Sequence, residues 1–281
     1  MIKDISFEFF PPRTEKMEQN LKQNIGKLME LSPKFVSITY GAGGTTRDKT
    51  HKIISKLISE TDLNVAAHLT CVNSSINEID EVIESYTSIG VKHIVALRGD
   101  MKDLGQFTPH PKGLNSSIEL VRHIKGKSNI KVSISGYPEP HPESQGISTD
   151  INFIKSKIDA GADQIITQFS FQAENYIKYR DTLVNQGINI PIIPGIMLIK
   201  SFKGIKNMSN KVGINVPNWV DKIIERETEE TQKVIAEDFA RTQSSVLESN
   251  GFEQLHFYTL NESKIMKNIA KHLGFYKKST I

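Results

Sequence analysis

The strongest constraint on the fold of this chain is a repeated alternation of strand-like and helix-like segments. Eight short runs rich in β-branched and aromatic residues recur along its 281 residues, at intervals of about 30 residues in the first half. Helical patterns separate these runs, as the βα units of a closed parallel barrel require. The runs are Ile5–Phe9, Phe35–Thr39, Val65–Leu69, His93–Leu97, Lys131–Ser135, Gln164–Gln168, Ile190–Ile196 and Leu255–Thr259. This order predicts an α/β fold of the (β/α)8 TIM barrel type, for which roughly 250 residues are usual.

Apolar residues at three- and four-residue spacing predict the helices between these runs. The predicted helices are Glu15–Leu31, Arg47–Glu60, Ile76–Ile89, Ser116–Lys125, Asp150–Ala160, Ala173–Asn185 and Ser201–Asn210, with Val216–Glu225 and Glu229–Leu247 before the eighth run and Glu262–Leu273 after it. Gly90, Gly161 and Gly187 stand where helix C-caps are expected. We therefore expect residues 1–281 to form a single catalytic barrel with an extra helical insertion between its seventh and eighth strands.

Charge and composition exclude several classes of partner. The net charge of +3 is spread along the chain, because lysines and glutamates are interleaved, so no nucleic-acid-binding surface is expected. No run of about 18 apolar residues is present, and hence no membrane span is expected. The one cysteine, Cys71, cannot form an intrachain disulfide, and the N-terminus enters a predicted strand without an apolar signal region. These features predict a cytoplasmic protein.

Polar side chains collect at the C-terminal ends of the predicted strands, where barrels of this type carry their active sites. They are Glu8, Thr39, Tyr40, His68, Thr70, Arg98, Asp100, Tyr137, His141 and Gln168. Strand ends are also where loops begin, and loops are polar, so a single position carries little weight. The joint pattern over six strands nevertheless predicts a functional site at this end of the barrel.

Glu8 is the most informative of these residues. It stands within an aromatic strand and is followed by Pro11 and Pro12, which must end that strand. Poor solvation of its carboxyl group would raise its pKa toward the range of a general acid. The alternative is a purely structural glutamate of the barrel interior, held by an arginine or a lysine.

Two glycine-containing segments resemble nucleotide-binding loops without matching them. The segment from Tyr40 to Thr46 lacks the third glycine of the dinucleotide-binding pattern, because Thr46 occupies its place. The segment from Gly126 to Ser128 lacks the first glycine of a P-loop, since Val121 stands there, and it precedes a strand. We expect no metal site, because paired His and Cys ligand motifs are missing from the sequence.

Seven strings, taken together, resemble the methylenetetrahydrofolate reductase family. They are Phe7-Glu8-Phe9-Phe10-Pro11-Pro12-Arg13, Thr39-Tyr40-Gly41-Ala42-Gly43-Gly44, His68-Leu69-Thr70-Cys71, Leu97-Arg98-Gly99-Asp100, Gly136-Tyr137-Pro138-Glu139 with His141-Pro142-Glu143, Thr167-Gln168 and His256-Phe257-Tyr258-Thr259-Leu260-Asn261. They cover nearly the whole chain in order. The resemblance is to the bacterial form that consists of the catalytic barrel alone.

The resemblance implies a barrel that binds FAD noncovalently and takes NADH or NADPH as co-substrate. It implies that Glu8 is the catalytic acid and that Asp100 lies beside the flavin and the folate. The FAD-binding positions that it implies are Tyr40, His68, Arg98, Gly99, Asp100, Tyr137, His141, Asp150 and Lys157. The substrate-binding positions that it implies are Thr39, Asp100 and Gln168.

The implied reaction is a ping-pong hydride relay, in which the nicotinamide nucleotide reduces FAD and leaves before 5,10-methylenetetrahydrofolate is reduced to 5-methyltetrahydrofolate for methionine synthesis. We expect the enzyme to be a homo-oligomer. The sequence departs from the family pattern at Glu262, where some bacterial members carry an arginine that helps to hold the folate tail; Lys264 or Lys200 could compensate. Two alternatives stay open, namely a flavin barrel resembling proline dehydrogenase and a noncatalytic pterin-binding barrel.

Overall fold

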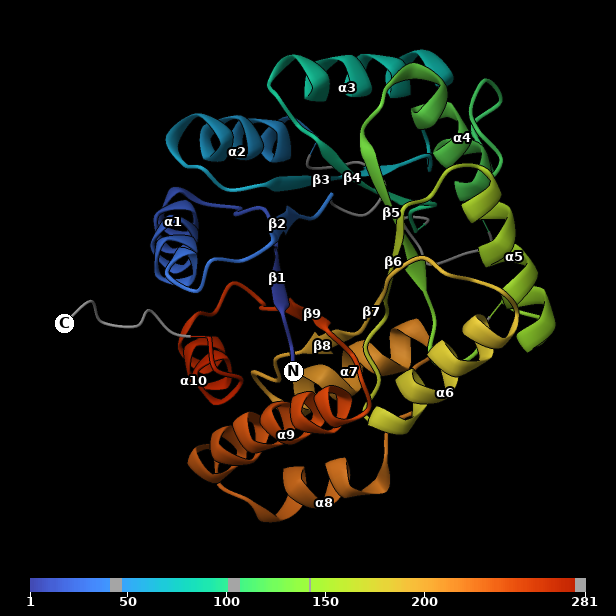
Figure 1. The fold of residues 1–281 in the computed structure, drawn as a ribbon. Coiled ribbons are helices and arrows are strands. Elements are labelled where there is room, and N and C mark those ends of the chain that lie inside the picture. The colour runs from blue at the N-terminus through green and yellow to red at the C-terminus, as the bar shows by residue number, and fades with distance from the viewer. Residues whose placement is uncertain (41–46, 101–106, 142, 276–281) are drawn as a thin grey trace.

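A parallel barrel dominates the structure, a computed structural model that describes residues 1–40, 47–100, 107–141 and 143–275. The described strands are β1 (Asp4–Phe9), β2 (Phe35–Ile38), β3 (Val65–Thr70), β4 (His93–Leu97), β5 (Lys131–Gly136), β6 (Gln164–Thr167), β7 (Ile192–Ile193), β8 (Gly195–Met197) and β9 (Gln254–Tyr258). Their order in the sheet is β7-β6-β5-β4-β3-β2-β1-β9-β8, with every pair parallel. The strands surround a central axis and the helices lie outside them (Figure 1). The predicted (β/α)8 barrel is confirmed.

The predicted seventh strand is wrong in one respect, because it is divided into β7 and β8 at Pro194. β7 pairs with β6 on one side, whereas β8 pairs with β9 on the other. Proline has no backbone N–H and therefore interrupts a ladder of hydrogen bonds. The Pro194 carbonyl still accepts a hydrogen bond from the His256 amide at 2.9 Å, so the bent segment closes the barrel.

The helices follow the predicted order, with ends that shift by a few residues. They are α1 (Glu15–Met29), α2 (Arg47–Glu60), α3 (Ile76–Ser88), α4 (Ser117–Lys127), α5 (Ile147–Asp159), α6 (Ala173–Asn185), α7 (Phe202–Val212), α8 (Asn218–Arg226), α9 (Glu229–Ser249) and α10 (Lys264–His272). Side-chain oxygens cap several N-termini; Ser75, for example, forms a reciprocal capping box with Glu78 at α3. Gly90 has a φ of +88° just beyond α3, a conformation that suits glycine at a helix C-terminus.

Three helices lie between β8 and β9, namely α7, α8 and α9. They pack through a second apolar cluster in which the Trp219 ring lies 5.8 Å from that of Phe171 and 5.4 Å from that of Phe239. Figure 1 shows α8 farther from the barrel axis than α9. Trp219 is therefore a packing residue. No helix in the described part of the chain is long and apolar enough to cross a membrane.

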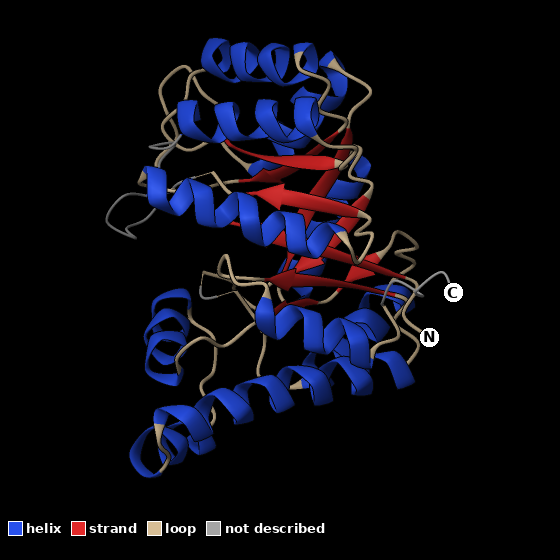
Figure 2. Cartoon of the chain, turned by 90° about the vertical axis from the view of Figure 1, so that its left-hand side faces the viewer, coloured by secondary structure: helices blue, strands red, loops and turns tan. Residues whose placement is uncertain are grey.

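The strands direct their C-terminal ends to one side of the molecule, and the N-terminus lies at the opposite side (Figure 2). The outward side chains of the strands pack against the helices in one large apolar cluster. The barrel interior holds a much smaller apolar cluster of Phe35, Ala66, Val95 and Ile166, partly covered by Leu97. The interior above this cluster is open to the side at which the strands end.

Candidate active site

A cavity of about 530 Å³ opens at the C-terminal ends of the strands. Ten of the twelve predicted site residues line it: Glu8, His68, Arg98, Gly99, Asp100, Tyr137, His141, Asp150, Lys157 and Gln168. They come from β1, β3, β4, β5 and β6 and from the segments that follow these strands, together with α5. The structure therefore brings together residues that are up to 160 positions apart in the sequence.

Thr39 and Tyr40 are the two predicted residues that do not line the described part of this cavity. They follow β2 directly, and residues 41–46 after them lie outside the described part of the chain. The Thr39 amide donates a hydrogen bond to the Phe9 carbonyl at 2.9 Å, which ties the end of β2 to the end of β1. Their predicted roles in binding remain predictions.

Glu8 lies at the base of the cavity between two imidazole rings. Its Oε2 is 3.2 Å from Nε2 of His68 and 3.6 Å from Nε2 of His256, and Ser37 Oγ donates to it over 3.4 Å. Its side chain is only 13% exposed. Among the described residues, the carboxylate is thus held by histidines and by no arginine or lysine of the kind that the structural alternative requires.

The pKa of Glu8 differs from the sequence-based expectation. Burial raises the pKa of this carboxyl group, as expected, but the two facing imidazoles outweigh burial and lower it from 4.5 to about 2. The sequence shows the aromatic neighbours of Glu8 and does not show partners that arrive from β3 and β9. The expectation of a raised pKa is therefore wrong for the protein without its ligands.

His256 and Tyr258 were assigned no role from the sequence, although both belong to a string quoted for the family resemblance. Parallel pairing places His256 beside Ser6 and Tyr258 beside Glu8. Nδ1 of His256 lies 2.8 Å from Ser6 Oγ, and the Tyr258 hydroxyl donates to the Thr167 carbonyl at 2.7 Å. The alternation of side chains along a strand was the available signal, because it puts His256 and Tyr258 on the same inward face.

Two cationic side chains line the cavity, Arg98 directly after β4 and Lys157 on α5. Lys157 is 3% exposed; its Nζ lies 3.4 Å from the Ser135 carbonyl and 4.6 Å from the centroid of the Phe153 ring. Burial and the nearby Arg98 lower the pKa of Lys157 from 10.5 to about 8, although Asp150 opposes them. A buried cation with no ion pair to the described residues is favourable for an anionic ligand.

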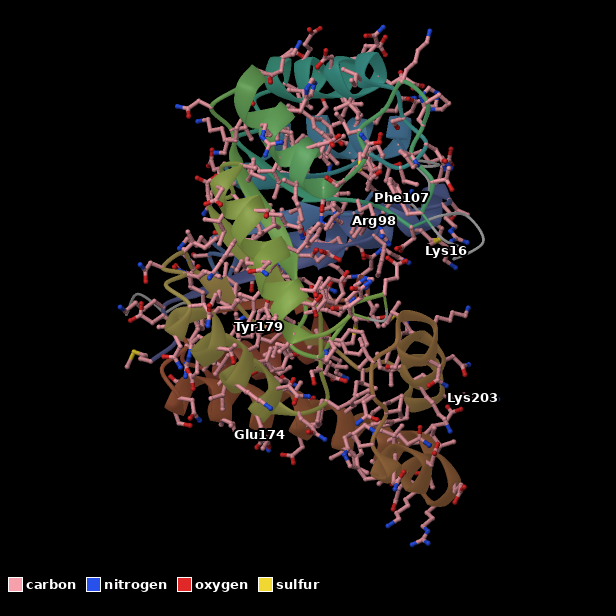
Figure 3. The ribbon with its side chains drawn as sticks, turned by 90° about the vertical axis from the view of Figure 1, so that its right-hand side faces the viewer. Lys16, Arg98, Phe107, Glu174, Tyr179 and Lys203 are labelled. Carbon is pink, nitrogen blue, oxygen red and sulfur yellow. The ribbon has the colours of Figure 1, made fainter. Side chains whose placement is uncertain are left out.

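Arg98 makes a two-pronged ion pair with Glu143, with distances of 2.6 and 3.2 Å. The pair with Glu143 raises the pKa of Arg98, so the guanidinium stays charged. The Arg98 guanidinium also lies 5.1 Å from the centroid of the Phe107 ring, and Figure 3 shows both at the edge of the barrel that also carries Lys203 of α7. Arg98 is thus fixed in direction at the rim of the cavity, where its fork can also bind phosphate oxygens.

Gly99 adopts a φ of +85°, which strongly favours glycine. A Cβ at this position would come within 2.4 Å of Cγ1 of Val72. The tight segment between Arg98 and Asp100 therefore lets backbone line the cavity wall, as a flat ligand requires. The steric need for glycine at this position comes from Val72.

Gln168 reaches the cavity from the end of β6. Its side-chain Oε1 accepts a hydrogen bond from the amide of Phe169 at 3.0 Å, which is the next residue in the chain. Among the described residues, no hydrogen bond from this side chain joins two strands. The arrangement favours contact with a ligand over the structural alternative in which Gln168 stitches the barrel together.

Two segments from opposite ends of the chain meet at the rim. The side chain of Asn261 accepts a hydrogen bond from the Phe10 amide at 2.8 Å and donates one to the Phe10 carbonyl at 3.0 Å. Leu260 and Asn261 both have positive φ, of +49° and +63°. Phe10 is 43% exposed and lines the cavity, so this clamp presents an aromatic ring to a ligand.

Glu262 follows this segment and pairs with Lys200 at 2.6 Å. Both side chains are exposed, by 41% and 64%. Lys200 is therefore engaged at the rim of the barrel and is not a free cation there.

The fit of a flavin dinucleotide to these residues rests on two features. The cavity is lined by Gly99, which carries no side chain, and also by a buried cation, Lys157, and by the fork of Arg98. An extended ligand with an aromatic ring system and a diphosphate would satisfy both. The described residues of the cavity therefore fit the implied cofactor.

Comparisons with known proteins agree over almost the whole chain. Residues 2–274 match the sequence model described as methylenetetrahydrofolate reductase. The 5,10-methylenetetrahydrofolate reductase of Pectobacterium carotovorum is 39% identical over 273 residues, which cover 96% of this chain and 90% of that protein. The Escherichia coli protein of the same name is 38% identical with the same coverage.

A more distant relative and a solved structure extend the comparison. The Arabidopsis thaliana methylenetetrahydrofolate reductase (NADH) 1 is 35% identical over 98% of this chain, which corresponds to 49% of its own length. A Clostridium thermocellum protein that binds two copies of 5-methyl-5,6,7,8-tetrahydrofolic acid has a TM-score of 0.69 at 13% identity, covering 98% of this chain and 94% of that one. At that identity the likeness concerns the fold alone.

Proposed function

The chain belongs to the methylenetetrahydrofolate reductase family, and from this membership we propose that it reduces 5,10-methylenetetrahydrofolate to 5-methyltetrahydrofolate with NADH or NADPH through noncovalent FAD. The observation that carries the proposal is the pairing, in one cavity, of a buried carboxylate with a buried cation. Glu8 lies at the base and Lys157 in the wall. In such a cavity, Glu8 can transfer a proton to a ligand at one end, and Lys157 can bind a diphosphate at the other.

FAD would be held by Tyr40, His68, Arg98, Gly99, Tyr137, His141, Asp150 and Lys157, and it would carry hydride between the nicotinamide nucleotide and the folate. Arg98 would bind diphosphate oxygens through its fork, and Lys157 would act as a point charge. A diphosphate beside Lys157 would also raise the pKa of its amine, against the burial that lowers it.

The substrate residues of this proposal are Thr39, Asp100 and Gln168. Asp100 is exposed at the cavity wall. As an anion it would oppose further negative charge nearby and favour a cationic folate. The amide of Gln168 can donate and accept hydrogen bonds, and so it could serve two substrates in turn at one site.

Glu8 would protonate the folate nitrogen that leaves when the methylene bridge opens. Its pKa of about 2 without ligands means that the carboxyl group is ionised near neutral pH until ligands cover the cavity. Flat ligands over Glu8 would exclude water and disfavour the carboxylate, which raises the pKa of Glu8 toward the useful range.

Separate measurement of the two half-reactions tests this proposal. The purified protein should show flavin absorbance, lose it on anaerobic addition of NADH or NADPH, and regain it on addition of methylenetetrahydrofolate. Loss of the absorbance with proline, and not with a nicotinamide nucleotide, would instead support the flavin barrel resembling proline dehydrogenase. A colourless protein that binds a pterin without turnover would support the noncatalytic alternative.

The product of the proposed reaction would supply methyl groups for methionine synthesis. The proposed assembly is a homo-oligomer. Sedimentation of the purified, flavin-loaded protein would give its mass in solution, which for one chain is 31.6 kDa. A mass equal to one chain would contradict that part of the proposal.

A further inference from the structure

We infer that His256, held by Ser6, is a positioning residue that controls the proton on Glu8 from beneath the cavity. The inference rests on the proposed function, because it concerns the proton that Glu8 gives during folate reduction. His256 does not line the cavity, whereas Glu8 and His68 do. It can therefore act on a ligand only through residues that do line the cavity, and its Nε2 faces one of them, Glu8.

The ring of His256 is fixed on all sides inside the barrel. It is fully buried, stacks on the Phe35 ring at 5.6 Å with an interplanar angle of 19°, and meets the Tyr258 ring edge-on at 5.2 Å. Pairing of β1 with β9 places Ser6 next to it in the same layer. A ring held in this way keeps its Nε2 directed at Glu8.

Because the hydroxyl of Ser6 can donate or accept a hydrogen bond, the His256 ring can adopt the tautomer that suits either protonation state of Glu8. Ser6 Oγ lies 2.8 Å from Nδ1 of His256 and 3.4 Å from the Leu255 carbonyl. When Glu8 is ionised, the hydroxyl donates to Nδ1 and the ring directs Nε2–H at the carboxylate. When Glu8 is protonated, Nδ1–H donates to Ser6, the hydroxyl turns to Leu255, and the Nε2 lone pair faces the acid.

Like Nε2 of His68, Nε2 of His256 is an unsatisfied atom of this arrangement. It is buried and makes no hydrogen bond with the described residues, although Oε2 of Glu8 is 3.6 Å away. A buried polar atom without a partner costs free energy and therefore needs an explanation. A proton that passes between Glu8 and the ring, with a small closing movement, would provide the missing hydrogen bond.

Other titratable groups also face this pair. His68 approaches Glu8 from β3, with its Nε2 3.2 Å from Oε2, and Tyr258 is next to Glu8 on β9. Burial and then Glu8 raise the pKa of the Tyr258 hydroxyl, which therefore stays neutral. Burial lowers the pKa of His93, on the far side of Phe35, to about 3, so it too is neutral near pH 7. Among the described residues, His68 and His256 are therefore the ionisable side chains whose ring nitrogens face the Glu8 carboxyl group.

Two substitutions of His256 separate the roles of its two nitrogens. In His256→Asn the amide can replace Nδ1 and keep the contact with Ser6, while nothing replaces Nε2. In His256→Gln the longer amide can replace Nε2 as an uncharged donor to Glu8. Ser6→Ala leaves the imidazole in place and removes only the group that sets its tautomer.

The test is the pH profile of the folate half-reaction, measured with flavin already reduced, for the flavin-loaded wild type and the three variants. A general acid loses activity as the pH rises through its pKa. Loss of a ring that favours the carboxylate should let Glu8 keep its proton to higher pH. We expect His256→Asn to move this limb upward by about one pH unit or more, with smaller upward shifts in His256→Gln and Ser6→Ala.

Reduction by the nicotinamide nucleotide should be unchanged in all three variants, since His256 and Ser6 do not line the cavity. An unshifted profile in both His256→Asn and Ser6→Ala would overturn the inference, as would equal losses in both half-reactions. If His256→Asn fails to fold, the profile of Ser6→Ala decides. If the wild type does not reduce methylenetetrahydrofolate at all, the proposed function is wrong. That outcome differs from a failure of the inference about His256, in which the wild type is active and the pH profiles of the variants do not shift.

Discussion

The inner and outer faces of the barrel wall are built from opposite kinds of side chain. Phe7 and Phe9 point from β1 into the large apolar cluster under the helices. Ser6 and Glu8, which alternate with them, point inward and meet His256 and His68. One strand thus contributes apolar side chains to stability and polar ones to the candidate site.

The difference shows which face of the barrel wall contributes most to the stability of the fold and which contributes to the candidate site. Burial of apolar surface against the helices stabilises the fold at roughly 25 cal/mol per Å². The interior has only a small apolar cluster, and its polar groups must find partners within the barrel. Substitutions on the outer face should therefore change the free energy of unfolding. Substitutions on the inner face should change proton transfer and ligand binding.

The largest effect is expected on the outer face. Leu120 is fully buried on α4 within the large cluster. Leu120→Ala should lower the free energy of unfolding by about 2–5 kcal/mol, because it removes buried methyl groups and leaves a cavity. Chemical denaturation measures the change, and both half-reaction rates per bound flavin should stay at the wild-type value.

Val234→Ala is the matched control for this prediction. Val234 lies on α9 and is 69% exposed, so its truncation should change stability by no more than about 0.5 kcal/mol. A loss of folate reduction in Leu120→Ala at full flavin occupancy would show that the outer face also shapes the site, and would break the comparison.

Glu8→Gln should produce the largest effect on catalysis. The substitution preserves size but removes the proton donor, so folate reduction should fall by about 10²-fold or more. Flavin binding and reduction by the nicotinamide nucleotide should persist, because the lesion concerns only the folate step. Stopped-flow measurement of the two half-reactions checks this, and a variant that reduces methylenetetrahydrofolate at the normal rate would remove Glu8 from the mechanism.

The sequence predicted the outer face better than the inner one, for a physical reason. Alternation of apolar and polar residues is local, so the strands, most helices and the inward direction of Glu8 could be predicted. The partners of Glu8 are 60 and 248 positions away in the chain, at His68 and His256, and only the closed barrel brings them near. For this reason the direction of the pKa shift could not be obtained from the neighbours of Glu8 in the sequence.

The division of the seventh strand has a similar explanation. The run Ile190–Ile196 is apolar throughout, and its composition alone favours one strand. Whether Pro194 interrupts a strand depends on which neighbour needs its missing N–H, and the neighbours β6 and β9 belong to distant segments. Arg98 was predicted from its place after a strand, whereas Lys157 came from the family resemblance alone, since it lies within a helix and nothing local to it indicates a shared cavity.

A smaller effect is expected deep in the barrel, beneath the cavity. Ser133 Oγ lies 2.6 Å from Nε2 of His93 and accepts a hydrogen bond from Gln164 at 2.8 Å. Ser133→Ala leaves both partners buried and unpaired, which should cost about 1–3 kcal/mol of stability. The three residues do not line the cavity, so the pH profiles of the half-reactions should be unchanged.

Ser156→Ala provides the control for Ser133→Ala. Ser156 Oγ donates to the Asn152 carbonyl at 2.9 Å on the exposed side of α5, where alanine favours the helix. Its stability should change by no more than about 0.5 kcal/mol. If Ser133→Ala shifted the profile of folate reduction as His256→Asn is expected to do, the polar interior would act as one network and not as separate layers.

The smallest effect is expected for Glu262→Gln, at the rim where the two faces meet. The ion pair with Lys200 is exposed, so its loss should lower stability by less than about 1 kcal/mol. It would free a cation next to the cavity mouth, on the side where the resemblance places the folate tail. The KM for a polyglutamyl folate should then fall by about two- to fivefold, while the KM for the monoglutamate changes less, because about 0.5–1 kcal/mol of charge attraction corresponds to that ratio.

Glu253→Gln is the matched control for Glu262→Gln. The ion pair of Glu253 with Lys3, at 2.5 Å, is also exposed, but Glu253 directly precedes β9 and so lies at the opposite end of the barrel. Steady-state kinetics at low and high salt checks both variants, and the gain should shrink at high salt because exposed charges are screened. Equal KM changes in the two variants would mean that the tail does not pass Lys200.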